Sequence, residues 1–341
     1  MDQPSLLVGA DVGGTSTKVA AVDHLGALLG FAVEPGGNIR SSSGSLTENL
    51  SRALTLAVPH ERRTDVVGGV LGIAGGGLAR ATEVSQIARL AWLRAGLPSR
   101  IEPVVCTDLE IAFAAGSDRP DGLMLLAGTG AVACWFANWR VVDRCDGMGW
   151  LLGDEGSGVW IGTAALRAVA AHLDGRGPTT ALTDLVLGEL RQDPHRPNTG
   201  PDVNPEDPRQ ELIRLVDDHP PSWFGRFAPP TAAAAAGGDN VASRIVSEAA
   251  EALVRSATRA ASGREVADVI LAGAVLTTAG PVSEAVRLGL AERYAATCTV
   301  VHSPVVGAII LAGRAAGWAV SRQAVTATLR GAMLSTPRRP S

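Results

Sequence analysis

Two short glycine-rich segments contain the residue types that bind phosphate groups. The first, Asp11-Val12-Gly13-Gly14-Thr15, lies between two apolar runs, where glycines permit a tight turn and a close approach of the backbone to a ligand. Thr15 and the backbone N–H groups of the turn can donate hydrogen bonds to phosphate oxygens. Asp11 can hold Mg²⁺ directly or through water, because Mg²⁺ prefers oxygen ligands and keeps several waters. A plain glycine hairpin, in which the Asp satisfies its own turn, explains this motif alone equally well.

The same arrangement recurs in Ala127-Gly128-Thr129-Gly130, which also separates two apolar runs. Two Gly/Thr turns that face each other would contact a triphosphate from both sides. Neither turn matches the P-loop or the dinucleotide-binding glycine pattern, so Lys18, the single lysine of the chain, is not assigned as a P-loop lysine. Further on, Gly273 and Ala274 end an apolar run, where a residue without a side chain lets an adenosine lie against the backbone.

Carboxylates at two places suit the chemistry of phosphoryl transfer. Asp108 follows an apolar run and opens a helical one; it is either a helix N-cap or a base that orients an attacking hydroxyl group and accepts its proton. The segment 147–158 has glycines around Asp154 and Glu155, just before a helix. Asp154 or Ser157 can cap that helix, but so many glycines favour a loop that folds over sugar hydroxyl groups.

The elements that position these residues follow from the hydrophobic pattern. Hairpin-like strands open the chain, strands then alternate with helices, and the opening pattern returns after a Gly-, Asp- and Pro-containing hinge at 116–121. Residues 191–208 read as an exposed loop, and the last dozen residues as frayed. The predicted strands are 6–10, 17–22, 27–33, 66–73, 101–105, 123–126, 131–136 and 266–272, and the predicted helices are 45–58, 82–95, 109–115, 159–172, 231–236, 241–261, 281–294 and 305–320.

Composition limits the classes of function. The chain has 341 residues, of which 46% are hydrophobic and 19% charged, so it can bury two cores and is not disordered. Its net charge of −4 argues against nucleic-acid or anionic-membrane partners, both of which require a basic surface. The four cysteines and six histidines show no zinc-ligand spacing. The N-terminus has neither a basic leader nor a membrane span, so we expect a cytoplasmic protein, with a homodimer as the default for an enzyme.

The motifs together resemble those of a known family. DVGGTSTK, CTDLEIAF, LLAGTGA, GWLLGDEGSG and LAGAV, in this order, are similar to the N-acetylglucosamine kinase and BadF-type ATPase family of the sugar kinase, heat-shock protein 70 and actin superfamily. The resemblance runs from Leu6 to Ala316. It implies an α/β fold of two actin-like (ribonuclease H-like) domains with a nucleotide cleft between them: 1–117 plus 313–330, then 118–312, with 331–341 as a tail.

The resemblance also implies a role for particular residues. ATP and Mg²⁺ would be the cofactors, and the γ-phosphoryl group would pass to the 6-hydroxyl of an amino sugar, N-acetylglucosamine or glucosamine, with Asp108 as the base. The remaining residues would contact phosphate (Gly13, Gly14, Thr15, Gly128, Thr129, Gly130), adenosine (Gly273, Ala274), Mg²⁺ (Asp11) or the sugar (Asn38, Gly147, Trp150, Asp154).

Departures from the family pattern keep the acceptor open. Ala131 stands where many members have Ser, and Gly75-Gly76-Gly77 replaces a serine-containing stretch, so two hydroxyl donors are missing. Two other classes of function remain: a BadF-type ATPase that activates a dehydratase or reductase, which requires cysteines for an iron–sulfur cluster, and a sugar- or nucleotide-binding regulator without catalysis.

Overall fold

The computed structural model describes residues 5–14, 16–36, 43–75, 80–191 and 207–335. They form two compact units, each with its own five-stranded sheet. The first unit contains Met1–Pro120, Asn138–Val141 and Val301–Ser341, and the second contains Asp121–Ala137 and Val142–Val300. Four residues singled out by the sequence analysis lie outside the described residues: the expected phosphate ligand Thr15, the expected sugar ligand Asn38, and Gly76 and Gly77.

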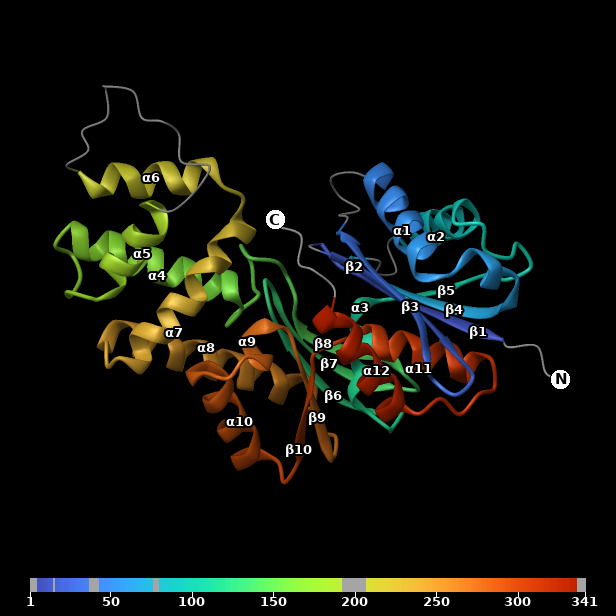
Figure 1. Cartoon of the computed structure of the whole chain (residues 1–341). Coiled ribbons are helices and arrows are strands. Elements are labelled where there is room, and N and C mark those ends of the chain that lie inside the picture. Colours follow the sequence, from blue (N-terminus) through green and yellow to red (C-terminus); the bar gives the residue numbers. More distant parts are fainter. Residues whose placement is uncertain (1–4, 15, 37–42, 76–79, 192–206, 336–341) are drawn as a thin grey trace, which may run out of the picture. The chain divides into compact units, whose positions relative to one another are not determined.

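The sheet of the first unit has the order β3-β2-β1-β4-β5 (Figure 1). Its first three strands are antiparallel neighbours, and β4 and β5 continue it in parallel with β1. Because β1, β4 and β5 are parallel, their carboxyl ends share one edge, and the residues that follow them meet there. The strands are β1 (Leu6–Val12), β2 (Ser16–Asp23), β3 (Leu28–Pro35), β4 (Val66–Ile73) and β5 (Val104–Cys106).

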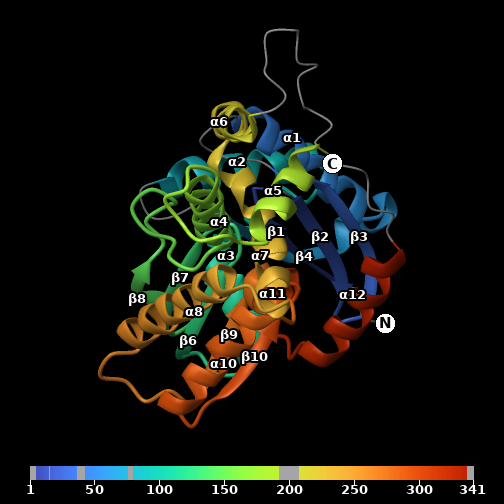
Figure 2. The ribbon, with the colours of Figure 1, turned by 90° about the vertical axis from the view of Figure 1, so that its left-hand side faces the viewer.

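Helices cover both faces of this sheet, as Figures 1 and 2 show. Alternation along β1 explains why both faces are apolar: Leu6 and Val8 belong to a core with α1 and α2, whereas Leu7 belongs to a core with α11 and α12. Gly9 lets α11 approach β1, since a Cβ there would come within 2.9 Å of Ile309. The helical elements are α1 (Ser43–Ala57), η1 (His60–Asp65), α2 (Ala81–Arg94), α3 (Asp108–Gly116), α11 (Val305–Ala315) and α12 (Arg322–Ser335).

The sheet of the second unit repeats this plan strand for strand. Its order is β10-β9-β6-β7-β8, with β6 antiparallel to β7 and parallel to β9. In both units a glycine turn therefore joins the central strand to its antiparallel neighbour. The strands are β6 (Gly122–Ala127), β7 (Ala131–Ala137), β8 (Arg140–Asp146), β9 (Asp268–Ala272) and β10 (Thr297–Val301).

The helices of the second unit pack into one large core with β6, β7 and β9. Helix α8 lies against β6 and β7, and α4 and α7 pack on α8. The helical elements are α4 (Gly158–Leu173), α5 (Leu182–Arg191), α6 (Pro208–Asp218), η3 (Pro221–Phe227), α7 (Ala228–Ala236), α8 (Asn240–Ala260), α9 (Ala274–Thr277) and α10 (Pro281–Arg293).

The structure confirms every predicted strand and helix, although most boundaries move by a few residues. Sequence analysis missed β8, β10, α5, α6 and α12, together with the short elements η1, η3 and α9. The closing helix was predicted to run to residue 320, but α11 ends at Ala315 and a separate helix, α12, reaches Ser335, within the stretch expected to fray. Most of the predicted loop 191–208 lies outside the described residues.

Helix α11 belongs to the first unit, whereas the sequence boundary at residue 313 had divided it between two domains. It packs on β1, β4 and α3, and its buried Val305, Ala308 and Ile309 complete the core on that face of the sheet. The chain therefore returns to the first unit directly after β10.

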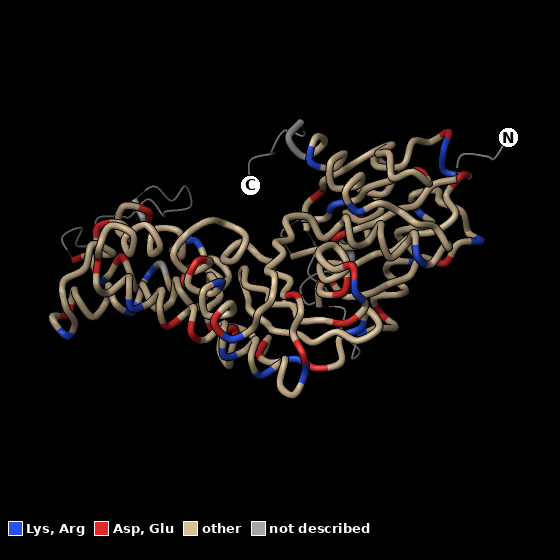
Figure 3. Tube along the Cα trace, turned by 90° about the horizontal axis from the view of Figure 1, so that it is seen from below, with Lys and Arg blue, Asp and Glu red and all other residues tan. Residues whose placement is uncertain are grey.

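Charged side chains of both signs are mixed along the described trace (Figure 3). Among the described residues, no helix is long and apolar enough to cross a membrane.

Candidate functional site

The first glycine turn lies at the carboxyl edge of the parallel strands in the first unit. Its backbone is closed by a hydrogen bond from the N–H of Gly13 to the carbonyl oxygen of Ser16, 2.9 Å long. Gly36, which follows β3, packs directly on the turn: a Cβ at this position would overlap the backbone of Gly14. The turn is thus held against the segment that leads toward Asn38.

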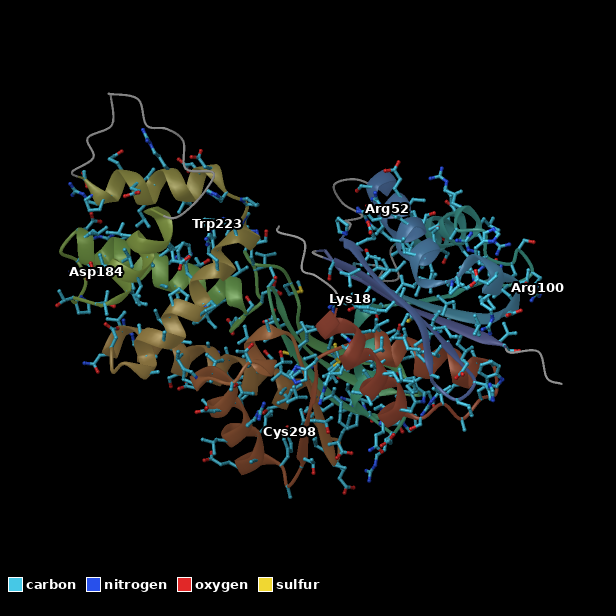
Figure 4. The ribbon with its side chains drawn as sticks, viewed as in Figure 1. Lys18, Arg52, Arg100, Asp184, Trp223 and Cys298 are labelled. Atoms are coloured by element: carbon cyan, nitrogen blue, oxygen red, sulfur yellow. The ribbon has the colours of Figure 1, made fainter. Side chains whose placement is uncertain are left out.

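An ion-pair network fixes that segment, and sequence analysis did not identify it. Nε of Arg52 lies 2.8 Å from Oε2 of the buried Glu34, and Nη2 of Arg52 donates to Oδ1 of Asn49 at 2.8 Å. Nδ2 of Asn49 in turn donates to the carbonyl oxygen of Gly36 at 3.2 Å. Figure 4 labels Arg52 on α1. The sequence gives little sign of this network, because Glu34, Asn49 and Arg52 form no recognisable motif. They meet only when α1 packs on β3.

Asp108 begins α3 but does not cap it. Thr107 is the N-cap, and it forms a capping box in which its hydroxyl accepts from the N–H of Glu110 and its own N–H donates to Oε2 of Glu110 at 2.9 Å. Arg140 forms an ion pair with the other oxygen of Glu110 at 3.2 Å. The capping interpretation of Asp108 is therefore wrong, and its carboxylate lies at the amino end of the helix, where negative charge is favoured.

Asp11 and Asp108 are brought together in the first unit, and the charge of Asp108 acts on the ionisation of Asp11. Burial raises the pKa of Asp11 to about 6, Lys18 opposes this shift, and the Asp108 carboxylate adds to it. Asp11 and Lys18 are paired across β1 and β2. The pKa of Asp108 is also raised by burial, partly offset by hydrogen bonds from backbone N–H groups, including that of Leu109. A carboxylate with a raised pKa is a better proton acceptor than one in water.

The arrangement around Asp11 fits a loosely held Mg²⁺ better than a metal enclosed by protein. Among the described residues, no group of three or more His, Cys, Asp or Glu side chains is placed to hold a metal ion. Mg²⁺ is commonly bound through one or two carboxylates together with phosphate oxygens and water, and Asp11 supplies one half-buried carboxylate beside the glycine turn.

The second glycine turn lies at the corresponding edge of the second unit. The N–H of Gly128 donates to the carbonyl oxygen of Gly130 at 2.8 Å, and the N–H of Gly158 donates to the carbonyl oxygen of Gly128 at 2.7 Å. Gly273, after the parallel strand β9, has φ of +85°, and a Cβ there would overlap the carbonyl oxygen of Ala127. Gly273 therefore packs closely on the second glycine turn, and the adenosine contact expected at this residue stays a prediction.

The Asp154 segment is folded onto this turn by a residue that sequence analysis missed. Asp146 Oδ1 accepts a hydrogen bond from the N–H of Asp154 at 2.7 Å, and its Oδ2 accepts from the N–H of Glu155 at 2.8 Å. Asp146 and Asp154 both have positive φ, +69° and +54°. An Asp directly before a Gly, at the end of a strand, was the available signal.

The Asp154 carboxylate lies against Gly130. A Cβ at Gly130 would come within 2.8 Å of Oδ2 of Asp154, and the carboxylate accepts hydrogen bonds from the N–H groups of Ala131 and Gly149. Burial raises the pKa of Asp154 despite these hydrogen bonds. Ser157, not Asp154, caps α4, with its hydroxyl accepting from the N–H of Trp160 at 3.1 Å.

Trp150 and Gly147 lie on the same loop as Asp154. Trp150 is half exposed and, with Leu151 and Leu152, lines a cavity of about 580 Å³ against α4 and α8. Gly147 contacts Val132 of β7. Gly75, on the other unit, has φ of +74° and is exposed after β4.

A second cavity, of about 390 Å³, adjoins the second glycine turn. Gly128, Thr129 and Ala274 lie on one side of it, and residues of η3, α7 and the start of α10 form the remaining wall. Sequence analysis placed Gly128, Thr129 and Ala274 but missed the wall from η3 and α7, because the cavity exists only when η3 packs on α4 and α7 packs beside α10.

Comparison with known proteins places the chain in a family. The model of the BadF/BadG/BcrA/BcrD ATPase family matches residues 8–312. The chain belongs to this family. The resemblance inferred from the motifs is therefore confirmed.

Two characterised relatives are sugar kinases by name. An N-acetyl-D-glucosamine kinase of Dictyostelium discoideum is 28% identical over 260 residues, which cover 73% of this chain and 76% of the relative. An N-acetylmuramic acid/N-acetylglucosamine kinase of Clostridium acetobutylicum is 30% identical over 195 residues, 55% of this chain and 61% of the relative.

Solved structures confirm the fold of two α/β domains. A Chromobacterium violaceum protein provisionally named an N-acetylglucosamine kinase superposes with a TM-score of 0.69 at 22% identity, covering 90% of this chain and 99% of that protein. A ROK family glucokinase of Streptomyces griseus, solved with glucose and AMPPNP, gives a TM-score of 0.56 at 18% identity, with coverage of 91% and 99%. At these identities the likeness concerns the fold alone.

Proposed function

We propose that this protein transfers the γ-phosphoryl group of ATP to the 6-hydroxyl of an amino sugar of the N-acetylglucosamine or glucosamine class. The observation that supports this most is the pair of Asp11 and Asp108, with raised pKa values, at the carboxyl edge of the first sheet. The membership of the chain in an ATPase family, and the names of its two relatives, agree with it.

Asp108 accepts the proton of the acceptor hydroxyl in this reaction. A bond forms between the sugar oxygen and the γ-phosphorus while the bond from that phosphorus to the β–γ bridging oxygen breaks, and ADP leaves with the electron pair. Little covalent help is required, so positioning and charge stabilisation supply most of the acceleration. Mg²⁺, when bound near Asp11, would neutralise negative charge on the phosphate oxygens.

The other predicted residues retain the roles that the resemblance implies. Backbone N–H groups of the two glycine turns would contact phosphate, and Gly273 and Ala274 would contact adenosine. Asn38, Gly147, Trp150 and Asp154 would contact the sugar. We propose that the second unit binds the nucleotide and that the first unit supplies the base.

The cysteines do not favour the alternative of a dehydratase or reductase activator. Cluster ligands are thiolates, yet burial raises the pKa of Cys106 to about 12 and that of Cys298 also above its ordinary value. Cys134 is buried as well. The thiols of Cys106 and Cys298 therefore resist deprotonation, and Cys106 and Cys134 are buried core residues.

A screen of ADP release tests the proposal. Purified protein with Mg-ATP would be offered glucosamine, N-acetylglucosamine, muramic acid derivatives, glucose and mannosamine, and we expect an amino sugar to give the highest kcat/KM. With that sugar, Asp108→Asn should lower kcat by about 10²–10⁴-fold. Asp184→Asn, at an exposed acid on α5 (Figure 4), is the matched control and should leave kcat unchanged. An unchanged kcat in Asp108→Asn would remove the base from the proposal.

A homodimer in the cytoplasm completes the proposal. Most enzymes of this size that self-associate form symmetric dimers, and ATP-dependent sugar phosphorylation belongs in a compartment that holds ATP. Light scattering of the purified protein measures the oligomeric state directly, and a single monomeric species at micromolar concentration would contradict the dimer.

A further inference from the structure

The wall that η3 contributes to the 390 Å³ cavity contains one charged side chain. Arg226 is the only ionisable residue among those that line the cavity, and its neighbours there are small or apolar, including Pro229, Ala232 and Val275. At one side the cavity meets Gly128 and Thr129 of the second glycine turn. A planar, apolar-faced group followed by a phosphate chain is the shape of ligand that such a lining accepts.

Glycines on α4 let η3 approach this turn closely. A Cβ at Gly162 would overlap the carbonyl oxygen of Phe224 on η3, and a Cβ at Gly158 would come within 3.1 Å of the carbonyl oxygen of Gly128 in the turn. Gly158 is itself hydrogen-bonded to Gly128. The position of η3, and of Arg226 on it, is therefore fixed relative to the phosphate turn by backbone packing inside one unit.

The guanidinium group of Arg226 is oriented by an aromatic ring and an acid. Its Cζ lies 4.5 Å from the ring centroid of Trp223, and its Nη2 lies 3.4 Å from Oε2 of Glu189. Trp223, labelled in Figure 4 within the helical part of the second unit, packs edge-on against the fully buried Phe227, with ring centroids 5.3 Å apart. The Arg226 side chain is thus held in a defined plane while it lines the cavity.

We propose that Arg226 stacks on the base of the bound nucleotide, so that the guanidinium lies between the ring of Trp223 and the base and sets the preference for ATP. This inference rests on the proposed function, because it names a residue of the proposed nucleotide site. A guanidinium stacks on aromatic faces as well as it pairs with anions. Glu189 offsets part of its charge, and the backbone N–H groups of the glycine turn already serve the phosphates, so a base is the better partner than a phosphate.

Binding of nucleotide and of bare triphosphate separates these two partners. Isothermal titration of the full-length protein with Mg-ATP, Mg-CTP and Mg-tripolyphosphate would compare wild type with Arg226→Gln and Arg226→Lys. We expect both variants to bind Mg-ATP about tenfold more weakly and Mg-tripolyphosphate as wild type does. The preference of the wild type for Mg-ATP over Mg-CTP should shrink in both, because the larger base has more surface to stack.

The control and the contrary outcomes are well defined. Arg293→Gln, at an exposed arginine at the end of α10, should bind every ligand as wild type does. Circular dichroism identifies variants that fail to fold. If Arg226→Gln fails to fold, Arg226→Lys, which keeps the charge and the aliphatic stem, takes its place in the comparison. The stacking role would be overturned if both variants bound Mg-ATP as wild type does. It would also be overturned if Arg226→Gln weakened the binding of Mg-tripolyphosphate and of Mg-ATP equally and Arg226→Lys restored both affinities. Either result would leave the kinase proposal intact. A wild type that binds no nucleotide would overturn both.

Discussion

Asp146 holds the backbone of Asp154, with its Oδ1 2.7 Å from the amide nitrogen of Asp154, and so sets the loop that lies on the second glycine turn. The same carboxylate accepts from the N–H of Glu155 at 2.8 Å. Both residues have positive φ, which is sparsely populated by non-glycine residues and needs such support.

Replacing Asp146 by Ala should detach the Asp154 loop. The variant loses two charge-assisted hydrogen bonds, and two backbone N–H groups lose their acceptors. We expect this loss to lower the free energy of unfolding by about 1–3 kcal/mol. We also expect a lower kcat/KM for the sugar. Urea unfolding and steady-state kinetics measure the two effects. Asp174→Ala, which removes an exposed ion pair to Arg176, is the control and should cost well under about 1 kcal/mol.

The raised pKa of Asp11 predicts how stability changes with pH. Its folded-state pKa of about 6 exceeds the unfolded value of about 3.9, so the folded protein binds the proton more tightly. The stabilising contribution is present below pH 4 and is lost as pH rises through 6. At pH 8, Asp11→Asn should therefore have a free energy of unfolding up to about 3 kcal/mol higher than that of wild type, measured by urea unfolding. This difference should vanish at pH 4. An advantage that is equal at both pH values would show that ionisation is not its cause.

Lys18 should set where the acid limb of the activity profile lies. Its ammonium group lowers the pKa of Asp11, and Asp11 must be ionised to hold Mg²⁺. In Lys18→Met the acid limb of the kcat/KM profile for Mg-ATP is expected to shift to higher pH, whereas Lys18→Arg, which keeps the charge, should leave it in place. A profile that stays fixed in Lys18→Met would contradict the coupling of these two residues.

If Gly273 belongs to the proposed nucleotide site, Gly273→Ala should weaken ATP binding more than its loss of stability explains. The new Cβ would overlap the carbonyl oxygen of Ala127 at a position with φ of +85°. Gly263 has a similar φ of +76° but an open surrounding, so Gly263→Ala reports the backbone cost alone, about 1 kcal/mol. We expect the KM for ATP to rise in Gly273→Ala and to stay constant in Gly263→Ala. Equal kinetics in the two variants would mean that the close approach at Gly273 serves packing only.

Local patterns were sufficient for much of the fold. Both glycine turns were found because apolar runs on either side of Gly and Thr need only neighbouring residues to form a hairpin, and β4 was predicted with the bounds that the structure shows. By contrast, β8 and β10 were missed, since strands whose residues are mostly half-buried or exposed carry little hydrophobic periodicity. The amphipathic helices α5, α6 and α12 were missed beside loop-like composition that masked their periodicity.

The sequence by itself therefore determined the two glycine turns, the alternation of strands and helices, and the family. Only the tertiary structure decided which carboxylates meet. Asp11 and Asp108 are far apart in the chain, and they come together because β1, β4 and β5 are parallel and end at one edge of the sheet. The support of Asp154 by Asp146 and the placing of Arg226 by Trp223 likewise depend on packing geometry, which residue type and spacing alone do not specify. The capping role of Thr107, by contrast, follows from its spacing to Glu110.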